Sequence, residues 1–192
     1  MTHRRAASFL MFMFLGALAA PVLSEDIPYI GSKKCKKCHL AEYESWEKTK
    51  MASALTVLKP GERKDAKIKA KLDPEKDYSK DPACLPCHTT GYGKPGGFVD
   101  FETTPTLAGV GCEMCHGAGG KYVAKEFMST ENDKFKKADL VPLGFNPEIK
   151  AATCTTLCHN TKSPFVGKDY VFDFEGRRKQ GTHENTPLQN QH

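Results

Sequence analysis

Residues 109–120 read GVGCEMCHGAGG, and at their centre Cys112 and Cys115 are separated by two residues and followed immediately by His116. Three related motifs occur elsewhere in the chain: CKKCH at 35–39, CLPCH at 84–88 and CTTLCH at 154–159. All eight cysteines lie in these four motifs, and each pair of cysteines is followed by a histidine. The motifs are called first to fourth in chain order, and together they decide what kind of fold the chain can form.

The spacing Cys-x-x-Cys-His is the attachment pattern of haem c. The two sulfurs form thioethers with the two vinyl groups of one haem, and the adjacent histidine becomes the proximal ligand of the iron. A disulfide framework or a series of zinc sites gives no reason for a histidine after every second cysteine. The first three motifs therefore predict covalent attachment at Cys35 and Cys38, Cys84 and Cys87, and Cys112 and Cys115, with His39, His88 and His116 as proximal ligands.

The fourth motif contains one residue more than the other three. Thr155, Thr156 and Leu157 separate Cys154 from Cys158, and His159 follows. An extra residue can bulge outward while both sulfurs still reach their vinyl groups, so we expect a fourth haem here with His159 as its proximal ligand. The alternative is a local disulfide between the two cysteines, with a free histidine beside it. The sequence thus predicts four covalently bound haem c groups.

The first 24 residues have the pattern of a secretory signal peptide. A basic region at 3–5 precedes an apolar stretch at 9–20, and small residues precede Glu25. The alternative is a retained anchor, but the stretch is shorter than the roughly 20 apolar residues that span a bilayer. We therefore expect residues 25–192 to form one exported tetrahaem domain, periplasmic or extracellular, without an integral membrane segment.

The charge of the chain changes when export and haem are considered. The formal net charge is +5 at pH 7, and Arg4 and Arg5 would leave with the signal peptide. Eight haem propionates would bring the mature protein to about −5. The basic composition is therefore no argument for a nucleic-acid partner. The mature part is polar, so we expect haem faces to supply much of the core, in a fold that is mainly α with much irregular structure.

The chain between the motifs predicts several helices. Apolar residues at helical spacing favour a helix over 39–58, ended by Pro60 and Gly61. A highly charged second helix is expected over 61–72 and a third over 121–140. Glycine and proline mark 90–98 as turn, and 160–192 is expected to wrap irregularly over the surface.

The chain resembles the tetrahaem cytochrome c-554 family. The stretches that carry the resemblance are CKKCHLAEYESWEKTKMASAL (35–55), CLPCHTTGYGKPGGF (84–98), GVGCEMCHGAGGKY (109–122) and GTHENTPL (181–188). The resemblance implies a mostly helical electron-transfer protein with haems stacked in pairs or in a chain. The chain is also similar to tetrahaem cytochromes that polymerise into extracellular conductive filaments. It departs from the family where Met51 and Tyr122 stand at positions that often hold histidine, and in the fourth motif.

Four haems need eight axial ligands for full six-coordination, and the proximal histidines supply four. Beyond the motifs, the mature chain has only two histidines, His183 and His192. Methionine is the next candidate ligand, so the distal candidates are His183, Met51, His192 and Met128. Met51 is expected to serve a haem other than that of His39, because both would lie on one helix. Each methionine has an alternative role as a core residue beside a haem, and His183 has one as a partner of a propionate.

Three functions are compatible with these residues. The leading one is an electron carrier that exchanges single electrons with redox partner proteins. A second is a haem enzyme in which one iron lacks a sixth ligand and acts on a small nitrogen or oxygen species. A third is a polymer of identical chains, in which a neighbour donates the missing ligand; it overlaps with the first.

Overall fold

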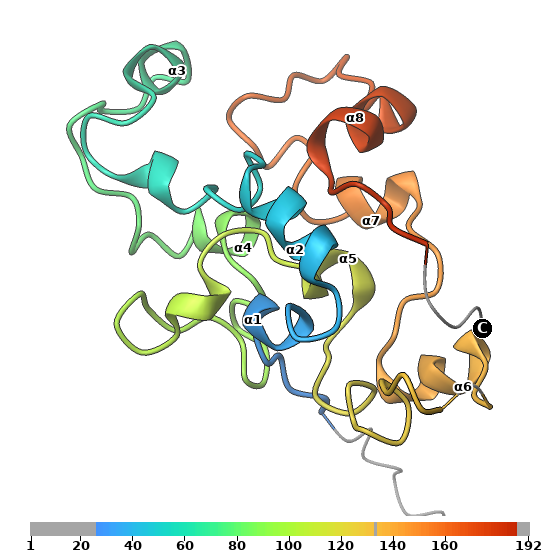
Figure 1. The fold of residues 1–192 in the computed structure, drawn as a ribbon. Helices are drawn as coiled ribbons and strands as arrows, with labels where there is room; N and C mark the ends of the chain where they lie inside the picture. Colours follow the sequence, from blue (N-terminus) through green and yellow to red (C-terminus); the bar gives the residue numbers. More distant parts are fainter. Residues whose placement is uncertain (1–25, 133, 188–192) are drawn as a thin grey trace, which may run out of the picture.

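The computed structural model describes residues 26–132 and 134–187, in which helices are the only regular elements besides one isolated β-bridge between Thr89 and Ala108. The helices are α1 (Ser32–Cys35), α2 (Leu40–Glu47), η1 (Thr56–Leu58), α3 (Lys64–Lys69), α4 (Leu85–His88), η2 (Pro105–Leu107), α5 (Glu113–His116), α6 (Lys137–Leu140), η3 (Val141–Leu143), α7 (Ala151–Thr155) and α8 (Phe174–Gly181) (Figure 1). The longest of these have eight residues. The predicted class, mainly α with much irregular structure, is confirmed.

The helix predicted over 39–58 was too long, because α2 ends at Glu47. Beyond it the backbone turns to meet the segment that precedes the third motif. The Met51 carbonyl accepts the N–H of Val110 at 2.8 Å, and the Trp46 indole N–H donates to the Val110 carbonyl at 2.9 Å. The backbone after Glu47 makes turn bonds, from Thr49 N–H to the Trp46 carbonyl and from Ala54 N–H to the Met51 carbonyl, in place of the i to i−4 bonds of a longer helix. Met51 therefore does not share a helix with His39, contrary to the expectation from the sequence.

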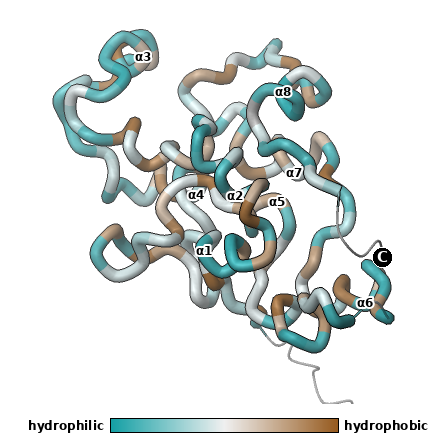
Figure 2. The backbone as a smooth tube through the Cα atoms, viewed as in Figure 1, coloured by the Kyte–Doolittle hydropathy of each residue, from teal (hydrophilic) through white to brown (hydrophobic). Residues whose placement is uncertain are grey.

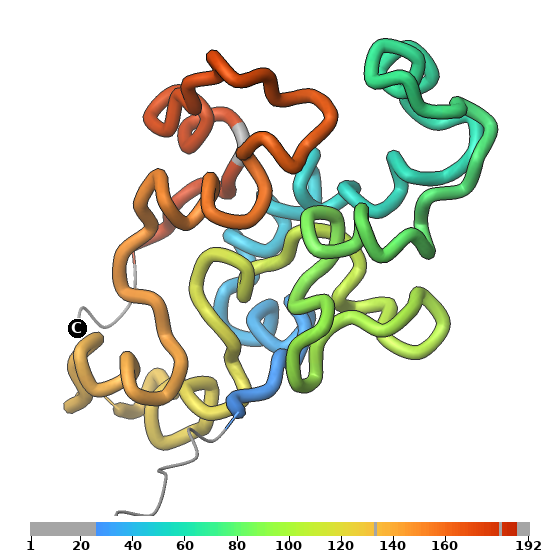
Figure 3. The backbone as a smooth tube through the Cα atoms, turned by 180° about the vertical axis from the view of Figure 1, so that it is seen from behind, coloured from blue at the N-terminus to red at the C-terminus, as the bar shows by residue number. Residues whose placement is uncertain are grey.

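Residues 59–80 form a lobe that projects from the rest of the chain and carries α3, as both Figure 1 and the opposite view in Figure 3 show. The helix predicted over 61–72 is present in its central part, Lys64–Lys69. Lys67 is buried in this lobe: its ammonium group donates to the Lys59 carbonyl and lies 5.7 Å from the centre of the Tyr78 ring. A lysine thus holds the two arms of the lobe together.

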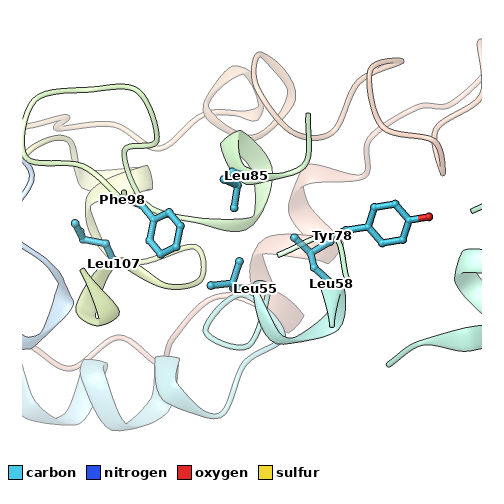
Figure 4. Packing of buried hydrophobic residues seen from close by; sticks show 6 residues of the cluster. All are labelled: Leu55, Leu58, Tyr78, Leu85, Phe98 and Leu107. Carbon is cyan, nitrogen blue, oxygen red and sulfur yellow. The ribbon is translucent and has the colours of Figure 1, made fainter. Parts of the chain in front are cut away.

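A small apolar cluster joins this lobe to the second motif. Its buried members are Leu55, Leu58, Tyr78, Leu85, Phe98 and Leu107, shown in Figure 4. Leu85 lies between the two cysteines of the second motif, so the cluster fixes α4 directly. Elsewhere, apolar stretches are dispersed along the chain, and α3 and α8 are mostly hydrophilic (Figure 2). The side-chain core is therefore thin, as the composition predicts.

The helix predicted over 121–140 was wrong, because most of that stretch consists of turns and only α6 is helical at its end. The Ser129 hydroxyl accepts the N–H of Glu131, and the Asn132 side-chain amide donates to the Glu126 carbonyl. Such local side-chain bonds compete with helical ones. The chain is also anchored by the Gly120 N–H, which donates to the Pro28 carbonyl at 3.0 Å.

The C-terminal region is more regular than predicted. Residues 160–173 are irregular, but α8 forms over Phe174–Gly181, within the stretch expected to wrap without structure. Asp173 is the N-cap of α8, and its carboxylate accepts the N–H of Gly176 at 3.0 Å. This is the usual way to satisfy a free N–H at a helix start.

Candidate functional site

Each of the four motifs begins at or within a short helix, although the first and fourth continue into turns. The backbone bonds of the first and third motifs have the same form. In the first motif the His39 N–H donates to the Cys35 carbonyl at 2.9 Å, and in the third the His116 N–H donates to the Cys112 carbonyl at 3.0 Å. This bond places the histidine one helical turn beyond the first cysteine. Both cysteines and the histidine of a motif are thereby held close to one another.

The fourth motif forms the same bond in spite of its extra residue. The His159 N–H donates to the Cys154 carbonyl at 3.0 Å. The bond here spans five residues instead of four, which is the wider turn of a π-helix. Leu157 is one of the exposed large hydrophobic residues, so the additional length is accommodated toward solvent. The backbone of His159 is therefore tied to the first cysteine of its motif, as it is in the first and third motifs.

The eight cysteines form no disulfide, including Cys154 with Cys158. Instead, cysteines of different motifs meet. The Cys35 thiol is hydrogen-bonded to Cys112, and that bond together with burial raises the pKa of Cys35. Burial raises the pKa of Cys158 to about 12, with a further contribution from its neighbour Cys87. The first motif thus lies beside the third, and the second beside the fourth.

The third motif also lies near the fourth. The pKa of Cys115 is raised to about 11, mainly by burial and in part by Cys154. Within the described ranges no group of three or more His, Cys, Asp or Glu side chains converges as the ligands of a metal ion do. Cysteines of different motifs therefore lie next to each other in twos. In the described residues they do not form the sets of three or four ligands that bind zinc.

The histidine of the second motif is oriented by a backbone carbonyl. The Nδ1 atom of His88 lies 2.6 Å from the Ala54 carbonyl oxygen. A carbonyl can only accept, so Nδ1 carries the proton and Nε2 is left with its lone pair. Burial lowers the pKa of His88, which favours the neutral ring. This is the tautomer that binds a metal through Nε2.

Of the distal candidates, His183 lies beside a motif histidine. The ring centroids of His116 and His183 are 6.2 Å apart, and the rings are tilted by 31°. The Nδ1 atom of His183 donates to the Glu184 carbonyl at 2.7 Å, which again leaves Nε2 with its lone pair. The next residues are held by α2, because the Ser45 hydroxyl accepts the Glu184 N–H at 2.9 Å.

The other distal candidates are placed less directly. Met51 is half-buried, and its carbonyl accepts the N–H of Val110. Val110 stands two residues before Cys112, so Met51 lies close in space to the start of the third motif. Met128 is half-buried in the turns after that motif. His192 and the predicted signal peptide at 1–24 lie outside the described residues. Tyr122 is buried, and its hydroxyl donates to the Gly117 carbonyl at 3.1 Å.

Several residues around the third motif were missed by sequence reasoning. The Asn146 side-chain amide donates to the Cys115 carbonyl, and the Asn146 N–H donates to the His116 carbonyl, both at 2.8 Å. Glu113, inside the motif, is 1% exposed and binds backbone from the N-terminal segment. Their partners are far away in the sequence, so no local pattern indicates these contacts.

In the part of the chain that the structure describes, no helix has both the length and the apolar character needed to cross a membrane. A family model described as "Cytochrome c554 and c-prime" matches residues 34–117, which include the first three motifs.

The chain is also similar to cytochrome c-554 of Nitrosomonas europaea. The two sequences are 49% identical over 187 residues, covering 87% of this chain and 80% of the relative. The crystal structure of reduced cytochrome c554 from the same organism matches with a TM-score of 0.71 and 35% identity, over 83% of this chain and 86% of that one. With half of the aligned residues identical and the same fold, the chain belongs to the cytochrome c554 family of tetrahaem c-type cytochromes.

Proposed function

We propose that each motif holds one haem, through Cys35 and Cys38, Cys84 and Cys87, Cys112 and Cys115, and Cys154 and Cys158. In each attachment a thiol adds across a vinyl group: a C–S bond forms, the thiol hydrogen goes to the neighbouring vinyl carbon, and nothing is lost. The proximal ligands are then His39, His88, His116 and His159. The shared backbone bond from histidine to first cysteine, which the fourth motif keeps in its wider turn, is the observation that carries this assignment.

His183 is proposed as the distal ligand of the third haem, opposite His116. Two imidazoles bound on the two faces of one porphyrin, with metal–nitrogen bonds of about 2 Å, have ring centroids roughly 6 Å apart. The separation between His116 and His183 is 6.2 Å. Met51, Met128 and His192 remain the candidates for the other irons; the Met51 carbonyl accepts the N–H of Val110, which stands two residues before Cys112.

The protein is proposed to carry single electrons between redox proteins through closely packed haems. The contact of Cys35 with Cys112 supports a pair made by the first and third haems, and that of Cys87 with Cys158 supports a pair made by the second and fourth. The proximity of Cys115 to Cys154 connects the two pairs. Electrons would then cross the chain without leaving the haem array.

The proposed location is outside the cytoplasm, periplasmic or extracellular, in respiratory electron transfer. It rests on the signal-peptide pattern at residues 1–24 and on haem attachment itself. A polymer of identical chains is a second candidate, because four haems exceed the number of histidines available as distal ligands. In such a polymer a neighbouring chain supplies a ligand, and electrons pass from one chain to the next.

The attachment is tested by the intact mass of the secreted protein under denaturing conditions, compared with the mass of the mature polypeptide. We expect an increase of four haems and no loss of other atoms. A reductive titration of the same sample should take up four electrons per chain. A mass increase of three haems would overturn the assignment of a haem to the fourth motif. An uptake of three electrons per chain would support that same negative result.

A further inference from the structure

Glu113 is a buried carboxylate in the middle of the third motif. Only 1% of its surface is exposed, and its carboxylate is bound by backbone N–H groups. Its oxygens accept backbone N–H groups from Gly31 at 2.8 Å, Ile30 at 3.0 Å and Gly119 at 2.8 Å. Several backbone donors can compensate a buried charge that would otherwise be costly to remove from water.

Two of these three donors belong to the segment that leads into the first motif. Gly31 is the N-cap of α1, the helix that ends at Cys35, and Ile30 precedes it. The third donor, Gly119, follows the third motif. The carboxylate of Glu113, at the start of α5, therefore bridges the start of α1 to the loop that follows α5.

An opposite bond joins the same two helices. Ser32, the first residue of α1, is 2% exposed, and its hydroxyl accepts the N–H of Cys112 at 3.2 Å. Cys112 is the N-cap of α5. The contact is close, because a Cβ added at Gly111 would stand 2.4 Å from the Ser32 hydroxyl oxygen. A side chain of α5, Glu113, thus accepts the N–H at the start of α1, and a side chain of α1, Ser32, accepts the N–H at the start of α5.

We propose that Glu113 and Ser32 form a reciprocal clamp that sets the distance and orientation between the first and third haems; the inference rests on the proposed haem attachments. Thioethers fix each haem to its own motif only. The separation of two haems therefore depends on how the two motifs are held together. Glu113 and Ser32 are positioning residues, because they act through α1 and α5 and are not assigned to an iron.

The amide variant Glu113→Gln tests the clamp with almost no change in volume. One oxygen becomes an NH2 group, so a donor faces a backbone donor and a buried N–H loses its acceptor. Ser32→Ala removes the opposite bond and deletes a single oxygen atom. Glu148→Gln is the matched control, since Glu148 is an exposed carboxylate on a different segment.

The measurement is the NMR spectrum of the oxidised holoprotein, in which paramagnetically shifted haem-methyl signals are assigned through contacts with the thioether protons of each cysteine. We expect Glu113→Gln and Ser32→Ala to shift the methyl signals of the first and third haems. Signals of the second and fourth haems should stay in place, and Glu148→Gln should leave all four haems unchanged. The potentials of the first and third haems should move with their signals.

Unchanged signals in either variant that still holds four haems would overturn the clamp, and so would equal shifts at all four haems, which indicate general loosening. If Glu113→Gln does not take up four haems, Ser32→Ala decides the question alone. The intact mass of the unmodified protein separates this inference from the proposed function. A wild-type protein without four haems contradicts the function, whereas four haems with no pair-specific shift contradict only the clamp.

Discussion

The rings of His116 and His183 lie 6.2 Å apart, although one belongs to the third motif and the other to the C-terminal segment. Contacts with α2 hold this segment in place: the Ser45 hydroxyl accepts the Glu184 N–H at 2.9 Å, and the Glu42 carboxylate accepts the Thr186 N–H at 3.2 Å. The first motif leads directly into α2. The helix after one proposed haem site therefore places the proposed distal ligand of another.

Replacing His183 by alanine should open the third haem. The ferrous protein should then bind carbon monoxide at one more haem per chain than the wild type does, because the gas needs a free coordination position. Visible spectra recorded during a titration with carbon monoxide measure this stoichiometry. Glu184→Ala is the control, since it keeps the backbone carbonyl of Glu184 to which His183 is bonded. Equal stoichiometry in His183→Ala and the wild type would show that His183 is not a ligand.

Removing both thiols of the fourth motif should remove one haem. We expect Cys154→Ser with Cys158→Ser to lower the intact mass of the denatured protein by one haem, because no thioether remains to hold it. A sample with an unchanged number of haems would contradict a haem at the fourth motif.

Replacing Met51 by histidine should lower one haem potential. A thioether sulfur stabilises ferrous iron relative to imidazole, so the shift should be on the order of 100 mV. A spectroelectrochemical titration of the four haems measures it, and the sulfur-to-iron charge-transfer band in the far red should disappear. Four unchanged potentials would instead assign Met51 to packing beside a haem.

The sequence was most informative where the chemistry is local. A haem fixes the spacing of its two cysteines and its histidine, so the four motifs are visible without any structure. The wider turn of the fourth motif was expected as a bulge, and the bond from His159 to Cys154 has that form. The N-cap of α8 is also a local signal, since the Asp173 carboxylate accepts an N–H three residues later in the same helix.

The remaining features depend on partners that are far away in the sequence. α2 ends at Glu47, and both Trp46 within it and Met51 beyond it are bonded to Val110, about sixty positions later. Glu113 accepts N–H groups from residues 82 and 83 positions earlier. Hydrophobic periodicity describes one face of one element and cannot indicate such bonds. The ends of the helices and the Glu113 contacts were therefore beyond prediction from the sequence.

The apolar cluster at the second motif should carry a large part of the stability. Leu107 is 3% exposed within this cluster, and Leu107→Ala should lower the free energy of unfolding by about 2–5 kcal/mol. Ile68 is 60% exposed on α3, so Ile68→Ala should change it by about 0.5 kcal/mol or less. Denaturant titrations of the holoproteins compare the two. Equal effects would mean that the haems, rather than this cluster, hold the second motif.

The missing axial ligand separates an electron carrier, a polymer and an enzyme. If His183, Met51 and His192 each serve one haem, one iron still needs Met128, a side chain of a neighbouring chain, or nothing. A ligand from a neighbour follows mass action, so dilution should open that site. The ferrous protein would then bind carbon monoxide at one haem when dilute and resist it when concentrated.

We expect a closed site at working concentrations, because six-coordinate irons change little in structure between oxidation states and so suit electron transfer. If Met128 closes the site within one chain, carbon monoxide should not bind at any dilution, and Met128→Ala should admit it at one haem. Titrations at several protein concentrations, with oligomeric state followed by light scattering, distinguish the two closures. Binding at one full haem per chain at every concentration would contradict both and favour a haem enzyme that acts on a small nitrogen or oxygen species.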